Sequence, residues 1–377
     1  MRLVGRKMVF ARQSVAPFIR DPNPSMPPVN QQLIADRLKI SRATVSRCFT
    51  NHPGINPKTR AQVFALASRL GYTPLEKRAE PAARSGSRSI TFGVLVCVEL
   101  PSFEHTAYGN PGQELLNGVS DLARGQNVRL DLHFVRPEDL HLDSPSYAAL
   151  RNSRHPKWNG VLLIYPFPRT VVDELVLKYP VVSLVEQYGG TPLNCVDVDH
   201  HRGVGRLFER LRALGHERIG FFTWRYPVEA TWSLRRFGAY VEQITEAGLP
   251  LRETDIINAG PRQALSIEAS YERVLAQTRE GVTAWICAAD HQAYDLIKWL
   301  EARGLKVPED VSIAGFDGLA RPAGGPLLST VQIPFHQIGV TGGRRLVDLV
   351  HKRFDAPQHI LLDCSLREGA TLGPRPA

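Results

Sequence analysis

The segment 30–49 has apolar residues at helical spacing on two short stretches, with a polar break between them. Ser41 stands at this break, where its hydroxyl can cap the second stretch. The pattern predicts two short helices joined by a tight turn. The inward faces of these helices carry Ile34, Ala35, Leu38, Val45 and Phe49.

A third helix is predicted directly after this pair. Asn56 is suited to cap it, and Pro57 fits the first helical position, where a missing N–H has no cost. Gly71 is a C-terminal stop signal. The apolar face of this third helix carries Val63, Leu66, Ala67 and Leu70, so the three helices can enclose one small core.

From residue 90 the pattern changes to short apolar runs that alternate with amphipathic helices. The run 90–96 is apolar nearly throughout, as is typical of a strand buried on both faces of a parallel sheet. Further strands are predicted at residues 128–135, 160–165, 181–185, 218–223, 255–258, 284–288 and 311–316. The helices between them are predicted at residues 114–123, 171–178, 202–214, 233–247, 267–277 and 293–303.

This alternation predicts an α/β fold of doubly wound parallel sheets. The pattern restarts near residue 200, so we predict two similar lobes with a cleft between them. Ligands of such sheets bind outside the carboxyl ends of the strands.

The charge of the chain is unevenly distributed. The net charge is +9, yet residues 26–88 alone carry eleven Lys or Arg against three Asp or Glu. A basic head on a mildly acidic body is typical of a nucleic-acid reader with a second function elsewhere in the chain. The hydrophobic share of 43% is sufficient for large cores, and no apolar run reaches the roughly 18 residues that a membrane span needs.

The five cysteines are scattered singly and form no C-x-x-C pair. Their count is odd, so we interpret them as reduced thiols and expect a cytoplasmic protein without a membrane partner. The adjacent His200 and His201 do not face one point on a helix, and we therefore expect no metal site and no cofactor.

The outward face of the second helix is suited to DNA reading. It offers two arginines, a methyl group and short hydroxyls, which can reach base edges and phosphates in a major groove. This is the helix-turn-helix arrangement, whose second helix is the reader. The predicted DNA-binding residues are Asn30, Gln32, Ser41, Arg42, Ala43, Thr44, Ser46, Arg47, Thr50, Asn51 and Arg84.

Several motifs at fixed spacing resemble the lactose-repressor (LacI/GalR) family of transcription regulators. In the head these are residues 41–47 (Ser-Arg-Ala-Thr-Val-Ser-Arg), 51–55 (Asn-His-Pro-Gly-Ile) and 70–74 (Leu-Gly-Tyr-Thr-Pro). In the body they are 214–220, 235–238, 288–290 and, most specific of all, 305–317, with a match that extends to about residue 372. Ala289 departs from the family pattern, which usually has Asn there.

The resemblance implies a helix-turn-helix headpiece at 26–73, a linker or hinge at 74–89 and a two-lobed body, like periplasmic binding proteins, at 90–377. Lobe 1 would comprise about 90–196 and 334–357, and lobe 2 about 197–333 and 358–377. Such a protein would bind operator DNA as a homodimer or larger assembly. It would also bind a small effector, with a sugar or derivative expected.

Two stretches outside these domains call for separate hypotheses. Residues 1–25 are basic and proline-rich without a secretory pattern, and we expect them to be disordered or untranslated, with Met26 as the start. The family's hinge helix wedges a leucine into the minor groove. Pro81 occupies that position here, although Ala79, Ala82 and Arg84 leave room for a helical turn or a minor-groove arm.

The effector residues are predicted from strand ends and from the resemblance. Asp317 ends a strand and Arg235 opens a helix, so that a carboxylate and a planar guanidinium can together bind vicinal hydroxyls. The alternative for this pair is an interdomain salt bridge. The predicted effector-binding set is Arg235, Asp317, Asp199, Asp290, Tyr165 and Trp232. Trp224 and Phe167 could also stack on a sugar ring, and ordinary core packing is the alternative for each aromatic residue.

Two other function classes remain as alternatives. A sugar-binding protein of the periplasmic type would share the body but not the helix-turn-helix. A sugar-processing enzyme would need an acid/base pair at a recognisable spacing, and the sequence has no H-E-x-x-H, G-x-S-x-G or P-loop motif. No catalytic residue is therefore predicted.

Overall fold

The structure is a computed structural model. It describes residues 30–49, 54–69, 90–98, 103, 108–151, 157–226, 228, 230–259, 264–353 and 356–376. The predicted N-terminal extension and the Pro81 linker lie outside the described residues, as do Thr50, Asn51 and Arg84. No described helix is long and apolar enough to cross a membrane.

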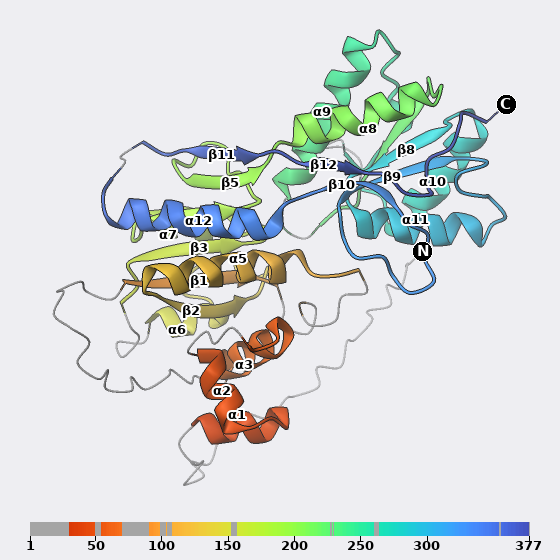
Figure 1. Cartoon of the computed structure of the whole chain (residues 1–377). Helices are drawn as coiled ribbons and strands as arrows, with labels where there is room; N and C mark the ends of the chain where they lie inside the picture. The colour runs from red at the N-terminus through yellow and green to blue at the C-terminus, as the bar shows by residue number, and fades with distance from the viewer. Residues whose placement is uncertain are drawn as a thin grey trace, which may run out of the picture.

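Three helices form the headpiece (Figure 1): α1 (Gln31–Leu38), α2 (Arg42–Phe49) and α3 (Pro57–Arg69). Both predicted caps are confirmed. The Ser41 hydroxyl accepts the N–H of Thr44 at 3.0 Å, and the Asn56 side chain accepts the N–H of Lys58 at 2.8 Å. The headpiece core consists of Ile34, Ala35, Val45, Cys48, Val63, Leu66 and Ala67.

The first sheet has six parallel strands in the order β11-β5-β4-β3-β1-β2. Their bounds are β1 (Ile90–Cys97), β2 (Val128–Val135), β3 (Gly160–Ile164), β4 (Val181–Leu184), β5 (Asn194–Val198) and β11 (His359–Leu362). β1 lies between β2 and β3, and its Val94 is paired with Leu132 of β2 and Leu162 of β3. Nearly continuous apolar residues in β1 are needed because both of its faces are covered.

Helices cover both faces of this sheet. Phe92, Val94 and Val96 share a core with α5 (Pro111–Gln126) and α12 (Phe335–Val350). Leu95 and Cys97 share the other core with α7 (Arg169–Val176); short η1 (Pro145–Tyr147) and α6 (Ala148–Arg151) follow β2. Figure 1 shows α5 and α12 side by side. They can pack this closely because residue 339 is a glycine. A Cβ at this position would lie only 2.2 Å from the Leu115 carbonyl oxygen.

The second sheet repeats this plan in the order β12-β10-β9-β8-β6-β7. Its strands are β6 (Ile219–Phe222), β7 (Ile256–Ile257), β8 (Ala284–Cys287), β9 (Ser312–Asp317), β10 (Ser329–Gln332) and the antiparallel edge strand β12 (Ser365–Arg367). Its helices are α8 (His200–Ala213), α9 (Thr231–Glu246), α10 (Ile267–Arg279) and α11 (Asp290–Glu301), with the short η2 (Glu253–Asp255) before β7. The α/β fold with doubly wound sheets is confirmed.

The chain passes between the two sheets three times. It leaves the first sheet after β5, returns between β10 and α12, and leaves again between β11 and β12. We predicted the third passage near residue 357, but β11 still pairs with β5, so the passage falls between Leu362 and Ser365. The sequence patterns after residue 328 did not predict β10, β11, β12 or α12.

Candidate functional site

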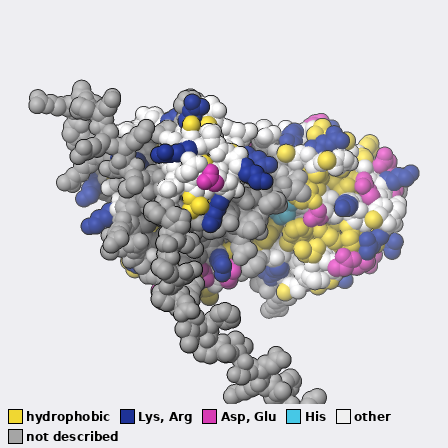
Figure 2. Space-filling model, turned by 90° about the horizontal axis from the view of Figure 1, so that it is seen from below, with side chains coloured by type: hydrophobic (Ala, Val, Ile, Leu, Met, Phe, Trp, Pro, Cys, Tyr) yellow, Lys and Arg dark blue, Asp and Glu magenta, His cyan; other side chains and the backbone are white. Residues whose placement is uncertain are grey.

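The outward face of α2 is exposed. Arg42, Ala43 and Arg47 are solvent-exposed, whereas Val45 and Cys48 are buried against the other headpiece helices. The headpiece faces the viewer in Figure 2, which shows Lys and Arg side chains on its described part and few acidic ones. The exposed basic residues there are Arg37, Lys39, Arg42, Arg47 and Lys58.

The polar residues that flank α1 and α2 are partly engaged within the headpiece. The Asn30 side chain caps α1 by accepting the N–H of Leu33 at 2.9 Å. Gln32 donates to Asp36 at 2.8 Å, and the Ser41 and Thr44 hydroxyls lie 2.8 Å apart. Arg42 and Arg47 are the long, exposed cationic side chains of α2.

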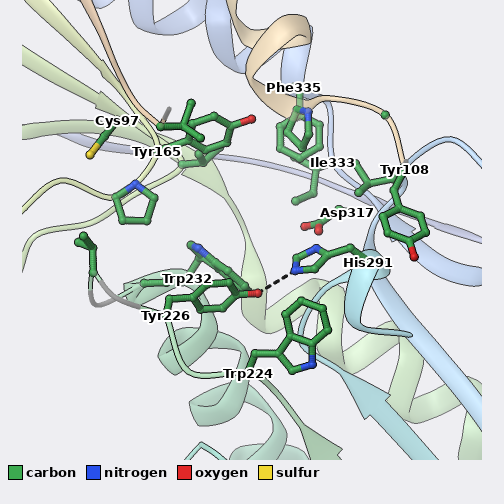
Figure 3. Close-up of a pocket in the computed structure, with 18 of the residues that line it drawn as sticks. Cys97, Tyr108, Tyr165, Trp224, Tyr226, Trp232, His291, Asp317, Ile333 and Phe335 are labelled. Atoms are coloured by element: carbon green, nitrogen blue, oxygen red, sulfur yellow. Dashed lines mark hydrogen bonds between the residues drawn. The ribbon is translucent and has the colours of Figure 1, made fainter. Parts of the chain in front are cut away.

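A cavity of about 570 Å³ lies between the two lobes. It opens at the carboxyl ends of the strands of both sheets, as expected for this fold. Its wall consists of Cys97, Val98, Tyr108, Gly109, Pro111, Pro137, Tyr165, Pro166, Val185, Trp224, Tyr226, Val228, Ala230, Trp232, Arg236, His291, Asp295, Asp317, Leu319, Ile333 and Phe335. Figure 3 shows Asp317 in this cavity, with Phe335 and Ile333 on one side and His291 on another.

Arg236 and Asp317 form a buried ion pair in this wall, with Nη1 and Oδ1 3.0 Å apart. The same Nη1 donates to the Ala288 carbonyl, and Nε donates to His200 at 3.3 Å. Burial raises the pKa of the Asp317 carboxyl, and the charge of Arg236 opposes that shift.

The prediction that Arg235 lies beside Asp317 is wrong, because its neighbour Arg236 takes that position. Arg235 lies one residue earlier on α9, and consecutive helical residues point about 100° apart. Its Nε is buried without a hydrogen-bond partner, and its charge lowers the pKa of Glu186, a residue outside the cavity wall. The adjacent arginines at 235 and 236 were the sequence signal for a cation at this site. Which of the two points at Asp317 depends on how α9 is rotated about its axis.

Asp199 and Asp290 do not belong to the cavity wall. Asp199 caps α8 by accepting the N–H of Arg202 at 3.0 Å. Asp290 is fully buried at the start of α11 and accepts from the Leu319 N–H at 2.7 Å and the Thr330 hydroxyl. Burial, followed by the charge of Asp317, raises the pKa of Asp290 to about 7. Both aspartates thus hold the backbone near the cavity.

The structure places Tyr165 and Trp232 in the cavity wall, together with Trp224. Phe167 is instead buried in the core beside α7. Sequence reasoning missed several wall residues, among them Tyr226 and His291. Both follow strand ends, β6 and β8 respectively, and this position was the available signal.

Tyr226 and His291 form a hydrogen-bonded pair, with the phenol oxygen and Nε2 2.8 Å apart (Figure 3). Gln292 also donates to the Tyr226 oxygen at 2.7 Å. Burial lowers the pKa of His291 to about 4, so the imidazole is neutral at physiological pH. The pair therefore offers polarity without charge.

Three cavity residues have backbone conformations that L-residues rarely adopt. The φ angles of Tyr165, Val185 and Asp317 are 72°, 60° and 140°. Such strain costs on the order of 1–3 kcal/mol per residue and clusters at functional sites. A β-branched residue with positive φ, such as Val185, is a particular outlier. The strain supports a ligand role for this cavity.

Glu186 connects the lobes beside the cavity. It follows β4 of lobe 1, and its carboxyl accepts from the N–H of Thr231 at 2.7 Å and from the Thr231 hydroxyl at the start of α9 in lobe 2. Burial raises the pKa of Glu186 to about 8. A second link joins Tyr108 of lobe 1 to Asp295 of α11 through a phenol–carboxylate hydrogen bond.

Comparison with known proteins matches two parts of the chain. Residues 32–74 match the family described as bacterial regulatory proteins, lacI family, and residues 208–372 match the periplasmic binding protein-like domain. Catabolite control protein A of Priestia megaterium is 27% identical over 334 residues, 85% of this chain and 92% of that protein. The transcriptional regulator AscG of Escherichia coli is 26% identical, over 80% of this chain and 86% of that protein.

Solved structures show the same fold. A complex of the transcriptional regulator CelR with cellobiose aligns with a TM-score of 0.62 at 22% identity, over 91% of this chain and 99% of that chain. The regulator CCPA from Weissella paramesenteroides with bound sucrose aligns with a TM-score of 0.58 at 22% identity, over 75% and 99%. At these identities the likeness concerns the fold.

Proposed function

Because the chain belongs to the LacI family of bacterial regulatory proteins, we propose that it is a sequence-specific transcription regulator whose operator affinity depends on a small effector. One observation carries this proposal: an exposed arginine-bearing α2 and a cavity between two lobes occur in the same chain. The first feature suits DNA and the second suits a small molecule.

A sugar or sugar derivative is the effector class that the relatives support, since structures of similar regulators hold cellobiose and sucrose. The predicted homodimer on operator DNA, the cytoplasmic location and the absence of enzymatic activity are part of the proposal. So are the boundaries of the headpiece at 26–73, the linker at 74–89 and the body at 90–377. Arg42 and Arg47 are the proposed base or phosphate contacts.

The proposed mechanism couples the cavity to the headpieces through the angle between the lobes. Both lobes contribute wall residues, so an effector that contacts both favours one lobe angle over others. The Glu186–Thr231 and Tyr108–Asp295 hydrogen bonds also bridge the two lobes. They would either oppose a change in the lobe angle or rearrange with it. A change in lobe angle would alter the spacing of the two headpieces of a dimer, and the coupling must be reciprocal.

A DNA-binding experiment tests the proposal. Operator candidates are selected from random duplexes with the full-length protein, and affinity is then measured by fluorescence anisotropy at fixed salt, with and without candidate effectors. We expect a sequence-specific complex whose affinity shifts with one effector. If the protein binds sugars but shows no preference for any DNA sequence, it is a sugar-binding protein without a regulatory role, and the proposal is wrong.

A further inference from the structure

His200 lies where the chain first passes from lobe 1 to lobe 2. It is the first residue of α8, and only Asp199 separates it from Val198, the last residue of β5. Asp199 donates its N–H to the Leu362 carbonyl at 2.9 Å, which joins the first passage to the third. The His200 side chain is buried, with 3% exposed. The imidazole is therefore in a position to contact both lobes.

Both nitrogens of the His200 ring are hydrogen-bonded, each to a different lobe. Arg236 of α9 in lobe 2 donates from Nε to Nδ1 at 3.3 Å, and Nε2 lies 3.1 Å from Oδ2 of Asp197 on β5 in lobe 1. A guanidinium nitrogen can only donate, so Nδ1 accepts and Nε2 carries the proton that it donates to Asp197. The ring is thus a bridge between the lobes.

The lobe 1 end of this bridge is fixed by three donors. Asp197 is buried, and its Oδ1 accepts the N–H of Val198 at 2.7 Å. Its Oδ2 accepts from the Gln187 side chain at 2.9 Å as well as from His200. Gln187 follows β4, the strand beside β5. Because both oxygens are engaged, Asp197 cannot follow a movement of lobe 2 without leaving a buried donor unpaired, which is unfavourable.

The lobe 2 end of the bridge reaches the cavity through one rigid plane. Nη1 of Arg236 pairs with Asp317 in the cavity wall, while Nε of the same guanidinium bonds to His200. Since the group is planar, a shift at Nη1 also moves Nε. The Phe316 ring restricts this movement, because its centre lies 3.9 Å from Cζ of Arg236 and 5.8 Å from the centre of the His200 ring.

We propose that His200 is a positioning residue that holds the two lobes at one angle through the buried chain Asp317–Arg236–His200–Asp197. Its two hydrogen bonds lie on opposite sides of the first passage, so a rotation of the lobes must break one of them or move the whole chain. A ligand that contacts Asp317 acts on the lobe angle through this chain. That last step rests on the proposed function, whereas the holding of the angle concerns the protein without ligand.

Distances between the lobes test the inference in the full-length protein without ligand. Spin labels are attached to Leu177→Cys in lobe 1 and Glu301→Cys in lobe 2, both exposed positions, and the five native cysteines are buried. Pulsed electron paramagnetic resonance measures the distance between the labels, with an excess of unlabelled protein that suppresses distances between chains.

His200→Phe keeps a planar ring and loses both hydrogen bonds. We expect one narrow distance distribution in the wild type and a distribution at least about twofold broader in this variant, because the hinge is no longer held. His200→Gln offers one acceptor and one donor, so it should restore a narrower distribution than His200→Phe.

His216→Phe is the matched control. His216 is also buried and bonded at both nitrogens, to the Thr283 hydroxyl at 2.9 Å and the Gly373 carbonyl at 3.0 Å, but these partners belong to lobe 2. We expect its distribution to equal that of the wild type. Asp197→Asn is a second test variant, since it keeps the shape and replaces an accepting oxygen by a donating amide. It should broaden the distribution as His200→Phe does.

Three outcomes would overturn the inference. The first is a distribution that neither His200→Phe nor Asp197→Asn changes. The second is equal broadening by His216→Phe. The third is that neither His200→Phe nor Asp197→Asn folds, which would make the chain an element of stability and not of positioning.

Operator affinity separates this inference from the proposed function. Specific operator binding together with unchanged lobe distances overturns only the role of His200. Absence of sequence-specific DNA binding in the wild type overturns the regulator proposal, whatever the distances show. Asp317→Asn keeps an oxygen that accepts from Arg236, so it should leave the lobe distances as they are in the wild type.

Discussion

The Arg236 guanidinium is held against the Asp317 carboxylate by two aromatic rings. Its central carbon lies 3.9 Å from the centre of the Phe316 ring and 4.7 Å from that of Trp232. Arg236 and Asp317 are both buried. Because Phe316 and Asp317 end β9 while Trp232 and Arg236 belong to α9, the ion pair fixes the cavity side of these two elements relative to each other.

Removing the carboxylate at this position should weaken effector binding and, because it leaves the buried Arg236 cation unpaired, should also lower the stability of lobe 2. Operator affinity of the folded protein without effector should stay unchanged. Asp317→Asn takes away a charged acceptor that lies in the cavity, which costs roughly 1–3 kcal/mol of effector binding, about tenfold or more in affinity. Calorimetry with the effector found in the operator-binding experiment measures the loss, and anisotropy without effector measures operator affinity. The exposed Asp143→Asn is the control. A fall in operator affinity alone would show that Asp317 is a structural residue of the body.

The two neighbouring arginines of α9 should differ in their contribution to stability. Arg236→Gln leaves Asp317 buried without its cation, which costs on the order of 3–5 kcal/mol of unfolding free energy. Arg235→Gln removes a side chain whose Nε has no hydrogen-bond partner, so we expect a much smaller loss. Urea unfolding followed by tryptophan fluorescence compares the two variants. Equal losses would mean that the Arg236–Asp317 pair does not stabilise lobe 2.

The exposed arginines of α2 should carry operator affinity. Arg47→Ala is expected to cost about 1–3 kcal/mol on the selected operator, because it removes a contact to a base edge or a phosphate. The measurement is an anisotropy titration at fixed salt. Arg279→Ala, an exposed arginine at the end of α10, is the matched control for net charge. Unchanged affinity in Arg47→Ala would remove this residue from the interface.

Stability should fall with rising pH through the titration of Glu186. Its pKa is raised from 4.5 to about 8 by burial, so the folded state binds a proton that the unfolded state has lost between these values. The stabilisation that comes from the protonated Glu186 carboxyl is therefore fully present below about pH 4.5 and is lost as the pH rises towards 8. Glu186→Gln mimics the protonated form and should remove this part of the pH dependence.

Urea unfolding across pH 5 to 8.5 compares the wild type with Glu186→Gln. Asp290, whose pKa is also raised, contributes a slope of the same sign in both proteins, so the difference between the two curves isolates Glu186. We expect the variant to gain stability relative to the wild type as the pH increases. Parallel curves would contradict the raised pKa of Glu186.

The sequence by itself determined the headpiece and the fold class. Ser41, Asn56 and Pro57 act within one helical turn, so their capping roles depend on neighbouring residues alone. The apolar strands of the two sheets were equally clear, because a strand covered on both faces must be apolar at nearly every position. These signals are local, and local signals can be read from the chain directly.

The tertiary structure decided which residues form the cavity. Arg235 and Arg236 have the same chemistry, and only the phase of α9 against β9 brings Arg236 to Asp317. Likewise β11 joins the first sheet through pairing with β5, a partner more than 150 residues earlier in the chain. The lobe 1 side of the cavity arises because β1, β2, β3 and β4 end at one edge, where Cys97, Pro137, Tyr165 and Val185 end or follow them. Such convergence depends on contacts between distant segments, which no local pattern of residues records.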